Sequence, residues 1–516
     1  MQDYSQAHLT QQLVYESARA HPERSALLFQ GRGMSYDKLA DSVARSRSYF
    51  GRIGVGPGDR VLLLLPDCPS FVIAFFGIIA AGGIPVPLST SVDIEEAAGA
   101  VSVAQPIVII VDERSAVRFK PLLLMEGVET VIIASWSAPA EFEREMQLCN
   151  ADHSIIYAPD RLAYGLFSSG STGAPKLIPH RHKDLLLAYD SYASPHVGYR
   201  YGDICLAVPK LHFGYGLGNN LAFPLRAGAA VILFPEAPNA SVLIEAALAH
   251  APTLFFSQPR ALAELLGVNT TREAMGSVRL CVSAGEPLHN SLIDRWRALT
   301  GTDIYDSYGT TEVGHVFMVP TPGNHRPGSV GGPIAGCDIV LRDPEGRPTE
   351  ETLGELWVRT PSAANCYWNN RAASEDVFQD GWVRTRDTFF RDEHGRFYPR
   401  GRVDDLIKLG CGKWVNPTDV EQLLTLVPGV SECVVLGTTG MDGLTVLKAI
   451  LVYEGTNNQV HAAEMAASSV REKWPNEPER WLTKVEFTRC LPKTSTGKIK
   501  RSAVDGQTMT EFAYNC

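Results

Sequence analysis

Several common signatures of function are missing from this sequence, and each absence narrows the possibilities. The ten cysteines are scattered, and no two stand in a CxxC or similar spacing. That pattern argues against a zinc site and is typical of reduced, mostly buried thiols in a cytosolic chain. Basic residues are also too few to give a positive charge: 47 Lys and Arg stand against 57 Asp and Glu, so the formal charge is −10. A nucleic-acid-binding protein usually has a basic surplus, so that class is disfavoured.

No segment has the features of a secretory signal or a membrane span. Residues 1–8 contain no basic region followed by an apolar run. The longest apolar stretch, Phe71 to Ala81, is too short to cross a bilayer and leads into Gly82-Gly83 and Pro85. We therefore expect a soluble, cytoplasmic protein in which this stretch is a buried helix. Its 516 residues, 45% of them apolar, are enough for more than one domain.

The P-loop motif of many nucleotide-binding proteins is absent as well. The nearest segment is Phe167 to Lys176, but Lys176 is followed by Leu177, where a P-loop requires Ser or Thr. The composition of the segment still suits a polyphosphate. Glycines let the backbone N–H groups close around phosphate oxygens, and the ammonium offsets their charge. The segment predicts a phosphate-binding loop of another type and disfavours a P-loop kinase.

Apolar strands alternating with helices predict an α/β fold. Strands at 61–65 and 84–88 flank the Phe71 helix, which is a βαβ arrangement, and further strands are expected at 107–111 and 128–134. A second α/β region follows the phosphate loop, with strands at 204–208, 230–234, 253–256 and 278–282 and helices at 241–250 and 290–300. Beyond residue 323, short strands with glycines and prolines predict a β-rich portion.

The last part of the chain has its own alternating pattern and predicts a small α+β domain. Helices are expected at 418–426 and 462–473, and strands at 432–436, 448–453 and 483–487. We expect a large N-terminal domain, residues 1–403, built of two α/β subdomains and the β-rich portion, and a mobile C-terminal domain, residues 404–516.

Polar segments stand at the predicted strand ends, where ligands gather in α/β sheets. They are Ser283-Ala284-Gly285-Glu286-Pro287, Tyr308-Gly309-Thr310-Thr311-Glu312, Thr385-Arg386-Asp387 and Gly401-Arg402-Val403-Asp404-Asp405. A further polar segment, Pro492 to Lys498, lies near the C-terminus. Together with the phosphate loop, these five segments are the candidate motifs of the chain.

The motifs resemble those of the adenylate-forming superfamily, which contains acyl- and aryl-CoA ligases, peptide-synthetase adenylation domains and luciferases. The resemblance extends from Gly58 to Lys498, with the motifs in the family's order. It implies a two-step reaction that uses ATP and Mg²⁺. A carboxylate attacks the α-phosphate of ATP to give an acyl adenylate and pyrophosphate, and a thiol, here CoA, then takes the acyl group.

The resemblance also implies a role for individual residues. Ser168, Ser169, Ser171, Thr172 and Lys176 would hold the β- and γ-phosphates, and Glu312 would coordinate Mg²⁺, which prefers oxygen ligands. Asp387 and Arg402 would bind the ribose, and Lys498 would reach the α-phosphate and the carboxylate. The remaining nucleotide-binding residues implied are Gly285, Glu286, Pro287, Asp306, Tyr308, Gly309, Thr310 and Thr311. Asp404 stands at the family's hinge, about which the C-terminal domain rotates between the two steps.

The segment Lys210 to Asn219 contains Phe213, Tyr215 and three glycines and, with Gly314 to Phe317, looks like that of benzoate- and anthranilate-type CoA ligases. Glycines let the backbone approach a flat ligand, and the aromatic rings offer it their faces and edges. The resemblance implies an aryl pocket lined by Phe213, Gly214, Tyr215, Ala284, Gly285 and His315. These segments have no acidic residue to pair with an α-ammonium group, which argues against an amino acid substrate. The role of His315, hydrogen bonding to a ring substituent or shaping the pocket, stays open.

Three positions depart from the family's pattern. Leu177 and Arg386 each replace a usual glycine, and the turn at Gly410-Cys411-Gly412 is one residue longer than in related ligases. The Arg386 guanidinium could engage Asp387 or point away from it. Two alternatives to an aryl-CoA ligase therefore remain: an enzyme that loads the phosphopantetheine of a carrier protein, and a nucleotide-binding regulator with impaired catalysis.

Overall fold

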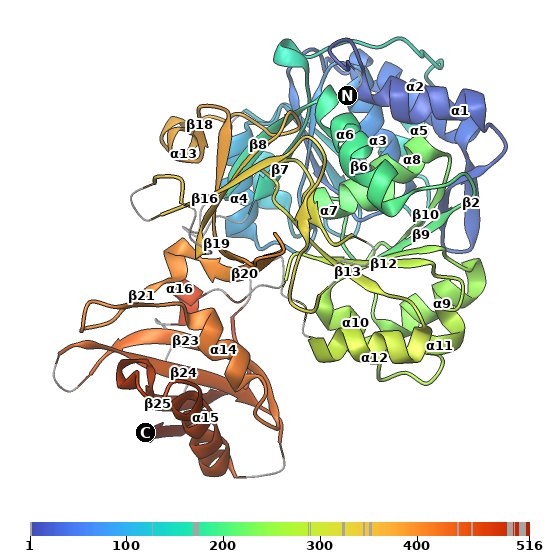
Figure 1. Cartoon of the computed structure of the whole chain (residues 1–516). Helices are drawn as coiled ribbons and strands as arrows, with labels where there is room; N and C mark the ends of the chain where they lie inside the picture. Colours follow the sequence, from blue (N-terminus) through green and yellow to red (C-terminus); the bar gives the residue numbers. More distant parts are fainter. Residues whose placement is uncertain are drawn as a thin grey trace. The chain divides into compact units, whose positions relative to one another are not determined.

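The computed structural model describes most of the chain, and every structural statement below concerns the described residues. They are residues 3–125, 127–168, 175–286, 288, 290–321, 326–343, 346–349, 353–440, 443–455, 458–492, 499, 501–504 and 512–515. The α/β class expected from the sequence is confirmed (Figure 1). Among these residues no helix combines the length and the apolar character that a membrane crossing requires.

A four-stranded parallel sheet forms the first layer of the N-terminal region. Its strands lie in the order β4 (Ile84–Pro87), β3 (Arg60–Leu64), β5 (Val108–Asp112) and β6 (Thr130–Ala134), accompanied by helices α2 (Tyr36–Arg52), α3 (Pro69–Ala80), α4 (Ile94–Ala104) and α5 (Glu141–Gln147). As predicted, α3 is buried from Ser70 to Ala80. It packs on α2 at Gly77, where an added Cβ would lie 2.2 Å from the Ser46 hydroxyl oxygen. Glycine therefore permits the close approach of the two helices.

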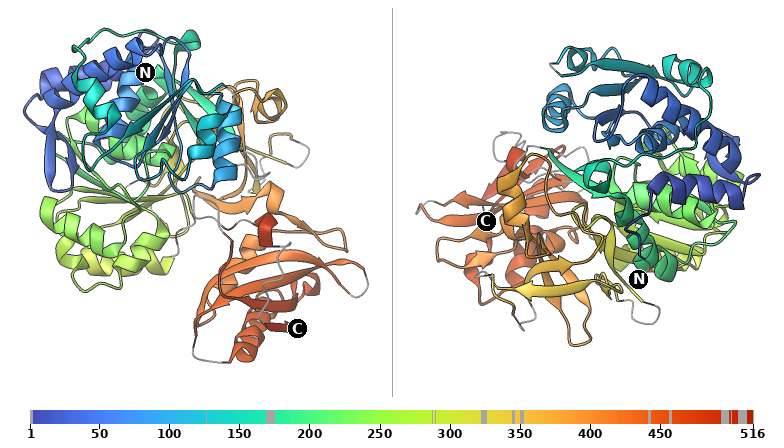
Figure 2. Two further views of the ribbon diagram at one scale, coloured as in Figure 1. Left: turned by 180° about the vertical axis from the view of Figure 1, so that it is seen from behind. Right: turned by 90° about the horizontal axis from the view of Figure 1, so that it is seen from above.

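A nine-stranded sheet forms the second layer. Its strands lie in the order β15 (Gly332–Pro333), β14 (Val316–Val319), β13 (Ile304–Gly309), β12 (Leu280–Ala284), β11 (Leu254–Ser257), β9 (Ile204–Ala207), β10 (Ala230–Leu233), β1 (Ser25–Phe29) and β2 (Arg32–Ser35). Helices α9 (Ala240–His250), α10 (Pro259–Leu265), α11 (Thr271–Ala274) and α12 (Asn290–Thr300) gather on one side of this sheet in Figure 1 and in the left view of Figure 2. Trp296 of α12 and Phe255 of β11 belong to the apolar core between them.

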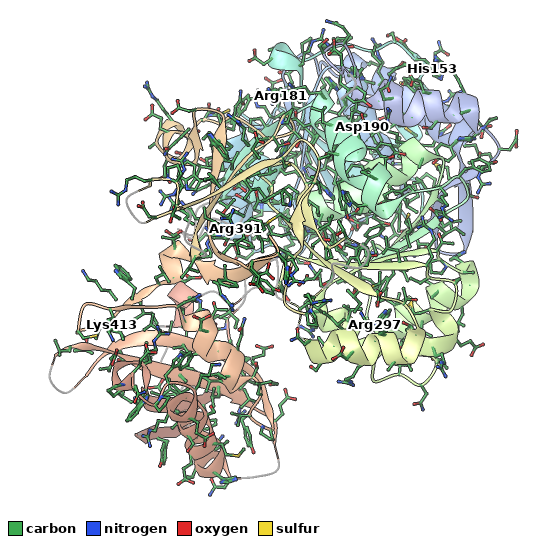
Figure 3. All side chains as sticks on the ribbon, in the orientation of Figure 1. His153, Arg181, Asp190, Arg297, Arg391 and Lys413 are labelled. Carbon is green, nitrogen blue, oxygen red and sulfur yellow. The ribbon has the colours of Figure 1, made fainter. Side chains whose placement is uncertain are left out.

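The phosphate segment connects two strands of an antiparallel hairpin, β7 (Leu162–Ser168) and β8 (Lys176–Arg181). Ser168 and Lys176 face each other across the hairpin. Helix α6 (His182–Ala188) begins directly after Arg181, which Figure 3 labels. A P-loop leads from a strand directly into a helix, so this geometry agrees with the sequence argument against one.

A five-stranded sheet contains the β-rich portion. It has the order β16 (Asp338–Arg342), β17 (Leu353–Arg359), β19 (Trp382–Arg391) and β18 (Phe378–Gln379), and β20 (Phe397–Arg402) also pairs with β19. Helix α13 (Arg371–Val377) precedes β18.

The C-terminal region has a four-stranded sheet, in the order β23 (Val430–Thr439), β24 (Thr445–Tyr453), β25 (Leu482–Thr488) and β26 (Phe512–Asn515). Helices α14 (Pro417–Leu424) and α15 (Gln459–Lys473) contribute apolar residues to its core, and β21 (Ile407–Lys408) pairs with β22 (Trp414–Val415). The chain separates into two compact units, residues 1–340, 357–385 and 391–398, and residues 341–356, 386–390 and 399–516. The division at residue 404 expected from the sequence stays a prediction.

Candidate active site

Glu312 lies in the turn between β13 and β14, and Tyr367 holds it there. The Tyr367 hydroxyl donates a hydrogen bond to Oε1 of Glu312 at 2.8 Å, and the Ala364 N–H donates to the Glu312 carbonyl oxygen at 2.9 Å. The same tyrosine ring lies 5.3 Å from the Lys176 ammonium. Tyr367 therefore links the candidate metal ligand to the end of the phosphate segment.

Sequence reasoning did not identify Tyr367. It stands in Asn365-Cys366-Tyr367-Trp368, a pair of aromatics within a polar stretch and far from the predicted motifs. The one sequence feature that could have drawn attention to it is a bulky aromatic residue in a loop. In the structure Tyr367 is only 5% exposed. Only the long-range contact with Glu312 reveals its position.

A single carboxylate is enough for the metal that the motifs imply. Mg²⁺ is usually bound through one or two carboxylates together with phosphates of the substrate, and it keeps several waters. In the described part of the chain, no cluster of three or more His, Cys, Asp or Glu side chains is placed to hold a metal. Glu312, next to the phosphate segment, fits this mode of binding, whereas a cage made wholly of protein ligands is not formed.

Several residues for which the resemblance implies nucleotide binding lie at the ends of β12 and β13. Gly285 has φ = +93°, a conformation that glycine adopts without strain. Asp306 is 3% exposed and lies opposite Ser283 in the parallel register. Burial raises the pKa of Asp306 to about 8, although a hydrogen bond from the Leu288 backbone opposes the shift. The Asp306 carboxyl group is therefore largely protonated at pH 7.

The predicted pocket residues come together beside this region. Helix α7 (Gly214–Leu217) begins after Phe213, and the Tyr215 hydroxyl donates to the carbonyl oxygen of Val282 in β12 at 2.9 Å. An added Cβ on Gly214 would lie 3.6 Å from the carbonyl oxygen of Gly314. Through these contacts Tyr215 lies next to the strand that contains Ala284, and Gly214 next to the turn that contains His315.

His315 is buried among aromatic rings. Its ring centroid lies 4.7 Å from that of Phe223, 5.1 Å from that of Tyr192 and 6.2 Å from that of Tyr215. Burial lowers the pKa of His315 to about 3, although the Tyr215 backbone opposes the shift. Neither ring nitrogen has a partner at normal hydrogen-bond geometry among the described residues. The imidazole is therefore neutral and has donor and acceptor capacity to spare.

Glycine at position 218 makes room for this imidazole. An added Cβ there would lie 2.3 Å from His315 Nε2 and 2.8 Å from Phe223 Cε2. Real Cβ contacts are not that short, so any side chain at Gly218 would displace the ring. At least one glycine of the Lys210–Asn219 segment is thus required by the position of the His315 ring.

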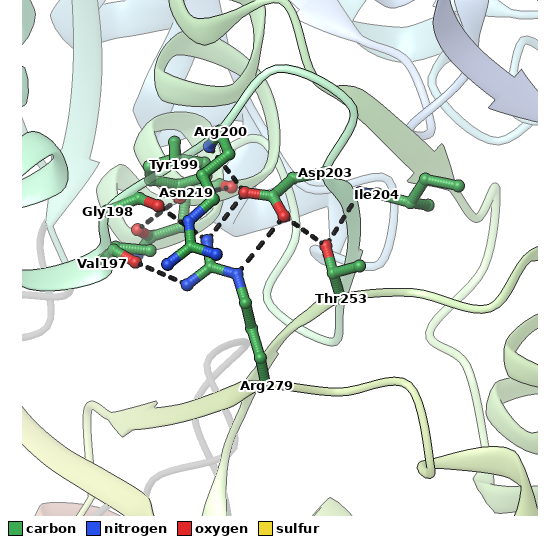
Figure 4. A network of polar contacts seen from close by, with 9 residues as sticks. All are labelled: Val197, Gly198, Tyr199, Arg200, Asp203, Ile204, Asn219, Thr253 and Arg279. Atoms are coloured by element: carbon green, nitrogen blue, oxygen red, sulfur yellow. Dashed lines mark hydrogen bonds and ion pairs between the residues drawn. The ribbon is translucent and has the colours of Figure 1, made fainter.

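Two polar networks connect neighbouring segments of the N-terminal region. The Tyr199 hydroxyl donates to the Asn219 side chain at 3.1 Å, which fixes the helical segment Gly218–Ala222. Arg279 donates to Asp203 at 2.7 Å and to the Gly198 carbonyl oxygen at 2.7 Å, and Thr253 donates to the same aspartate at 2.7 Å (Figure 4). Asp203 is buried and the Arg279 side chain is 27% exposed, so these hydrogen bonds satisfy the buried carboxylate from a partly exposed partner.

The candidate ribose residues lie in a chain of ion pairs. Arg402 Nη1 is 3.7 Å from Asp387 Oδ1, and Arg402 Nη2 is 3.7 Å from Asp404 Oδ2. Nη1 of Arg386 donates to both carboxylate oxygens of Asp404, at 2.9 and 3.1 Å. The side chain that replaces the usual glycine is therefore bound to the predicted hinge residue.

Several predicted site residues lie outside the described part of the chain. They are Ser169, Ser171, Thr172, Pro287 and Lys498. Of the remaining predicted residues, Glu286 is half-buried, Tyr308 packs edge-on against Phe317 at 5.3 Å, and the carbonyl oxygen of Thr311 accepts a hydrogen bond from Gly314. Gly309 and Thr310 lie between these two, with Gly309 against the backbone of His315.

Comparison with known protein families shows which family this chain belongs to. The family model described as AMP-binding enzyme matches residues 14–368. The chain belongs to the AMP-binding enzyme family. The match includes the pocket segment, Glu312 and Tyr367, whereas Asp387, Arg402 and Lys498 lie beyond its end. The resemblance to adenylate-forming enzymes seen in the motifs is thereby confirmed.

Individual relatives in this family are similar over nearly the full chain. The sequence is 33% identical to a benzoate–CoA ligase from Thauera aromatica over 484 residues, which are 90% of this chain and 89% of that protein. It is 34% identical over 489 residues to a 4-hydroxybenzoate–CoA/benzoate–CoA ligase from Rhodopseudomonas palustris, covering 91% of this chain and 88% of that protein. The crystal structure of the anthranilate CoA ligase AuaEII in complex with anthranoyl-AMP matches with a TM-score of 0.87, 30% identity and 96% coverage of both chains.

Proposed function

We propose that this protein is an AMP-forming acid–thiol ligase that activates an aromatic carboxylic acid of the benzoate or anthranilate type with ATP and transfers it to CoA. The observation that supports the proposal is the uncharged cluster of aromatic rings around His315, in the same turn as Glu312, in a chain about one-third identical to a benzoate–CoA ligase over 90% of its length.

The pocket supports an aromatic acid over an amino acid or a long aliphatic acid. Tyr215, Tyr192 and Phe223 surround His315, and the neutral imidazole adds no charge. A flat ring gains from edge and face contacts with such neighbours, whereas an α-ammonium group would require an acidic partner. We therefore place the ring of the acid against Phe213, Gly214, Tyr215, Ala284, Gly285 and His315.

The nucleotide would be held by the motifs around Glu312. Bound Mg²⁺ would neutralise phosphate charge, and Glu312, positioned by Tyr367, would supply its protein carboxylate. Ser168, Ser169, Ser171, Thr172 and Lys176 would hold the leaving pyrophosphate. Lys498 would offset the negative charge that develops as the carboxylate approaches the α-phosphate. Asp387 and Arg402 would bind the ribose hydroxyls.

The second step requires a different arrangement of the C-terminal residues. We propose that residues 404–516 rotate about Asp404 after adenylation, which would withdraw Lys498 and bring the turn between β21 and β22 towards the acyl group. Rotation of this kind lets one site exclude water from a labile adenylate and then admit a large thiol. We also propose a cytoplasmic location, which the scattered cysteines of the sequence support.

The product assay tests this proposal directly. Purified protein is incubated with ATP, Mg²⁺ and benzoate or 2-aminobenzoate, with either free CoA or a holo-carrier protein as the acceptor. We expect the aryl-CoA thioester and AMP, with free CoA preferred. A strong preference for the carrier would make the protein a carrier-loading enzyme, and formation of neither thioester would contradict the proposal.

A further inference from the structure

Arg386 has an unusual backbone conformation. Its φ is +60°, in the left-handed region that few residues other than glycine adopt. The preceding residue, Thr385, and the following residue, Asp387, do not share this conformation. A strained backbone angle persists only where surrounding contacts compensate for its cost. The contact that Arg386 makes through its side chain is therefore of interest.

That contact is a two-oxygen ion pair with Asp404. Arg386 Nη1 lies 2.9 Å from one carboxylate oxygen and 3.1 Å from the other, and the two side chains are 27% and 30% exposed. The pair joins strand β19 to the short 3₁₀ turn Val403–Asp405, which begins after β20. Charge-assisted bonds of this kind are stronger than neutral ones, and partial burial reduces their screening by salt.

The pair belongs to a longer chain of charges. Asp404 is also 3.7 Å from Arg402, and Arg402 is 3.7 Å from the candidate ribose ligand Asp387. A change at Asp404 therefore alters the surroundings of Asp387 through one intervening guanidinium. Arg386, which replaces the usual glycine, is thus connected through Asp404 and Arg402 to the candidate ribose ligand Asp387.

The residues on either side of Asp404 are held by different parts of the second unit. Gly401 packs so closely on the start of α14 that an added Cβ would lie 2.8 Å from Thr418 Oγ1. Asp405 lies 3.6 Å from Arg501, which also pairs with Glu421 at 2.6 Å. Asp404 itself is held from β19 by Arg386. A backbone rotation at residue 404 therefore cannot leave all three contacts intact.

We infer that Arg386 is a positioning residue that restrains the backbone at Asp404 through their ion pair, and that this pair opens when the chain rotates there. The inference rests on the proposed function only for the rotation itself. The restraint belongs to the free protein and is present without any substrate. Removing the guanidinium makes the Val403–Leu406 segment open more often and shifts the balance between the two half-reactions.

Hydrogen exchange of the full-length, ligand-free protein tests the restraint. The amide of Leu406 donates to the Val403 carbonyl oxygen, so its exchange reports opening of this turn. Arg386→Asn removes the charge but tolerates the left-handed backbone. We expect about threefold faster exchange of residues 403–406 at low salt in this variant, and a smaller difference at 1 M salt. Arg386→Lys, which keeps the charge, should restore part of the protection.

A double-mutant cycle assigns the effect to the pair. Asp404→Asn should raise exchange as Arg386→Asn does, and the double variant should add little to either change. Additive effects, or equal exchange rates in the wild type and Arg386→Asn at low salt, would overturn the inference. Loss of fold is monitored in the same experiment by exchange in the core strands β23 and β24, which must be unchanged for the comparison to count.

The half-reactions supply the second readout. The rate of aryl-adenylate formation and the rate of CoA transfer from supplied aryl-AMP are measured separately, and we expect their ratio to change at least threefold in Arg386→Asn. An unchanged ratio would overturn the positioning role. If the wild type forms no aryl adenylate at all, the proposed function fails, while the exchange data still decide whether the restraint exists.

Discussion

The aromatic cluster around His315 and the ion-pair chain around Asp404 differ in how far their polar side chains are buried and in whether these are charged. His315 is 4% exposed, is neutral and lies among aromatic rings. The side chains of Arg386 and Asp404 are 27% and 30% exposed and form an ion pair. Desolvated neutral groups discriminate strongly between ligands because an unmatched partner is costly, whereas half-exposed charges give smaller, salt-dependent effects. One region is suited to choosing the acid and the other to adjusting a conformation.

The largest effect is expected at Lys498, whose charge would act at the reacting phosphate rather than in either region. Lys498→Ala should lower the rate of adenylation about 1,000-fold, because nothing then offsets the repulsion between carboxylate and phosphate. CoA transfer from supplied aryl-AMP should stay within about threefold of the wild type. Pyrophosphate release and single-turnover thioester formation measure the two steps. Lys473→Ala, on the exposed last turn of α15, is the matched control and should affect neither.

A substitution at Gly218 should disturb the position of the His315 ring. Gly218→Ala places a methyl group where His315 Nε2 would be only 2.3 Å away, so the imidazole must move. We expect catalytic efficiency towards the aromatic acid to fall about 100-fold, with stability reduced by about 1–3 kcal/mol. Gly51→Ala, at a helical position with nothing within 4 Å of the added carbon, is the control: it should leave activity unchanged and raise stability by up to about 1 kcal/mol. Equal losses for ATP and the acid would contradict a specific effect on the pocket.

The buried carboxyl group of Asp306 should make the stability of the protein depend on pH. Its pKa is raised from 3.8 to about 8 by burial, so between pH 4 and 8 the folded protein holds a proton that the unfolded chain has lost. This group therefore makes stability fall as pH rises through that window, by at most about 1.4 kcal/mol per pH unit, and adds no further loss above it. Asp306→Asn should flatten the dependence in denaturant titrations at pH 5 to 9. A slope identical to that of the wild type would show that Asp306 is ionised in the folded protein.

The smallest effect is expected in the ion-pair chain itself. Asp387→Asn should raise the KM for ATP about fivefold while leaving the KM for the acid within twofold, because it weakens the acceptor for the ribose hydroxyls. The difference should shrink between low and 0.5 M salt. Initial-rate kinetics with each substrate varied in turn measure it. A larger change for the acid than for ATP would remove Asp387 from the nucleotide site.

The sequence was sufficient wherever structure follows from a local pattern. The continuous apolar run Phe71–Ala81 predicted a buried helix, and α3 is one. The position of strand β1 beside β10 in the second sheet could not be predicted, because pairing between distant residues such as Leu27 and Val231 leaves no local pattern. Strand β8, Lys176–Arg181, was hidden by its proline and charged residues.

The candidate site shows the same division. The resemblance to adenylate-forming enzymes predicted a role for Glu312, and the resemblance to benzoate- and anthranilate-type CoA ligases predicted one for Tyr215 and His315. Tyr367 and the pair between Arg386 and Asp404 were out of reach, because each depends on a contact between distant parts of the chain. From the sequence, the Arg386 guanidinium could either engage Asp387 or point away from it. The structure shows it bound to Asp404.

The most direct test of the whole account is ATP–pyrophosphate exchange with a panel of acids. The panel contains benzoate, 2-aminobenzoate, hydroxybenzoates, cinnamates and medium-chain fatty acids, each with Mg²⁺ and without CoA. The account predicts that exchange depends on an added acid and is fastest with a benzoate or aminobenzoate. Fastest exchange with a fatty acid, or exchange with none of these acids, would contradict an aryl pocket built around Tyr215 and His315.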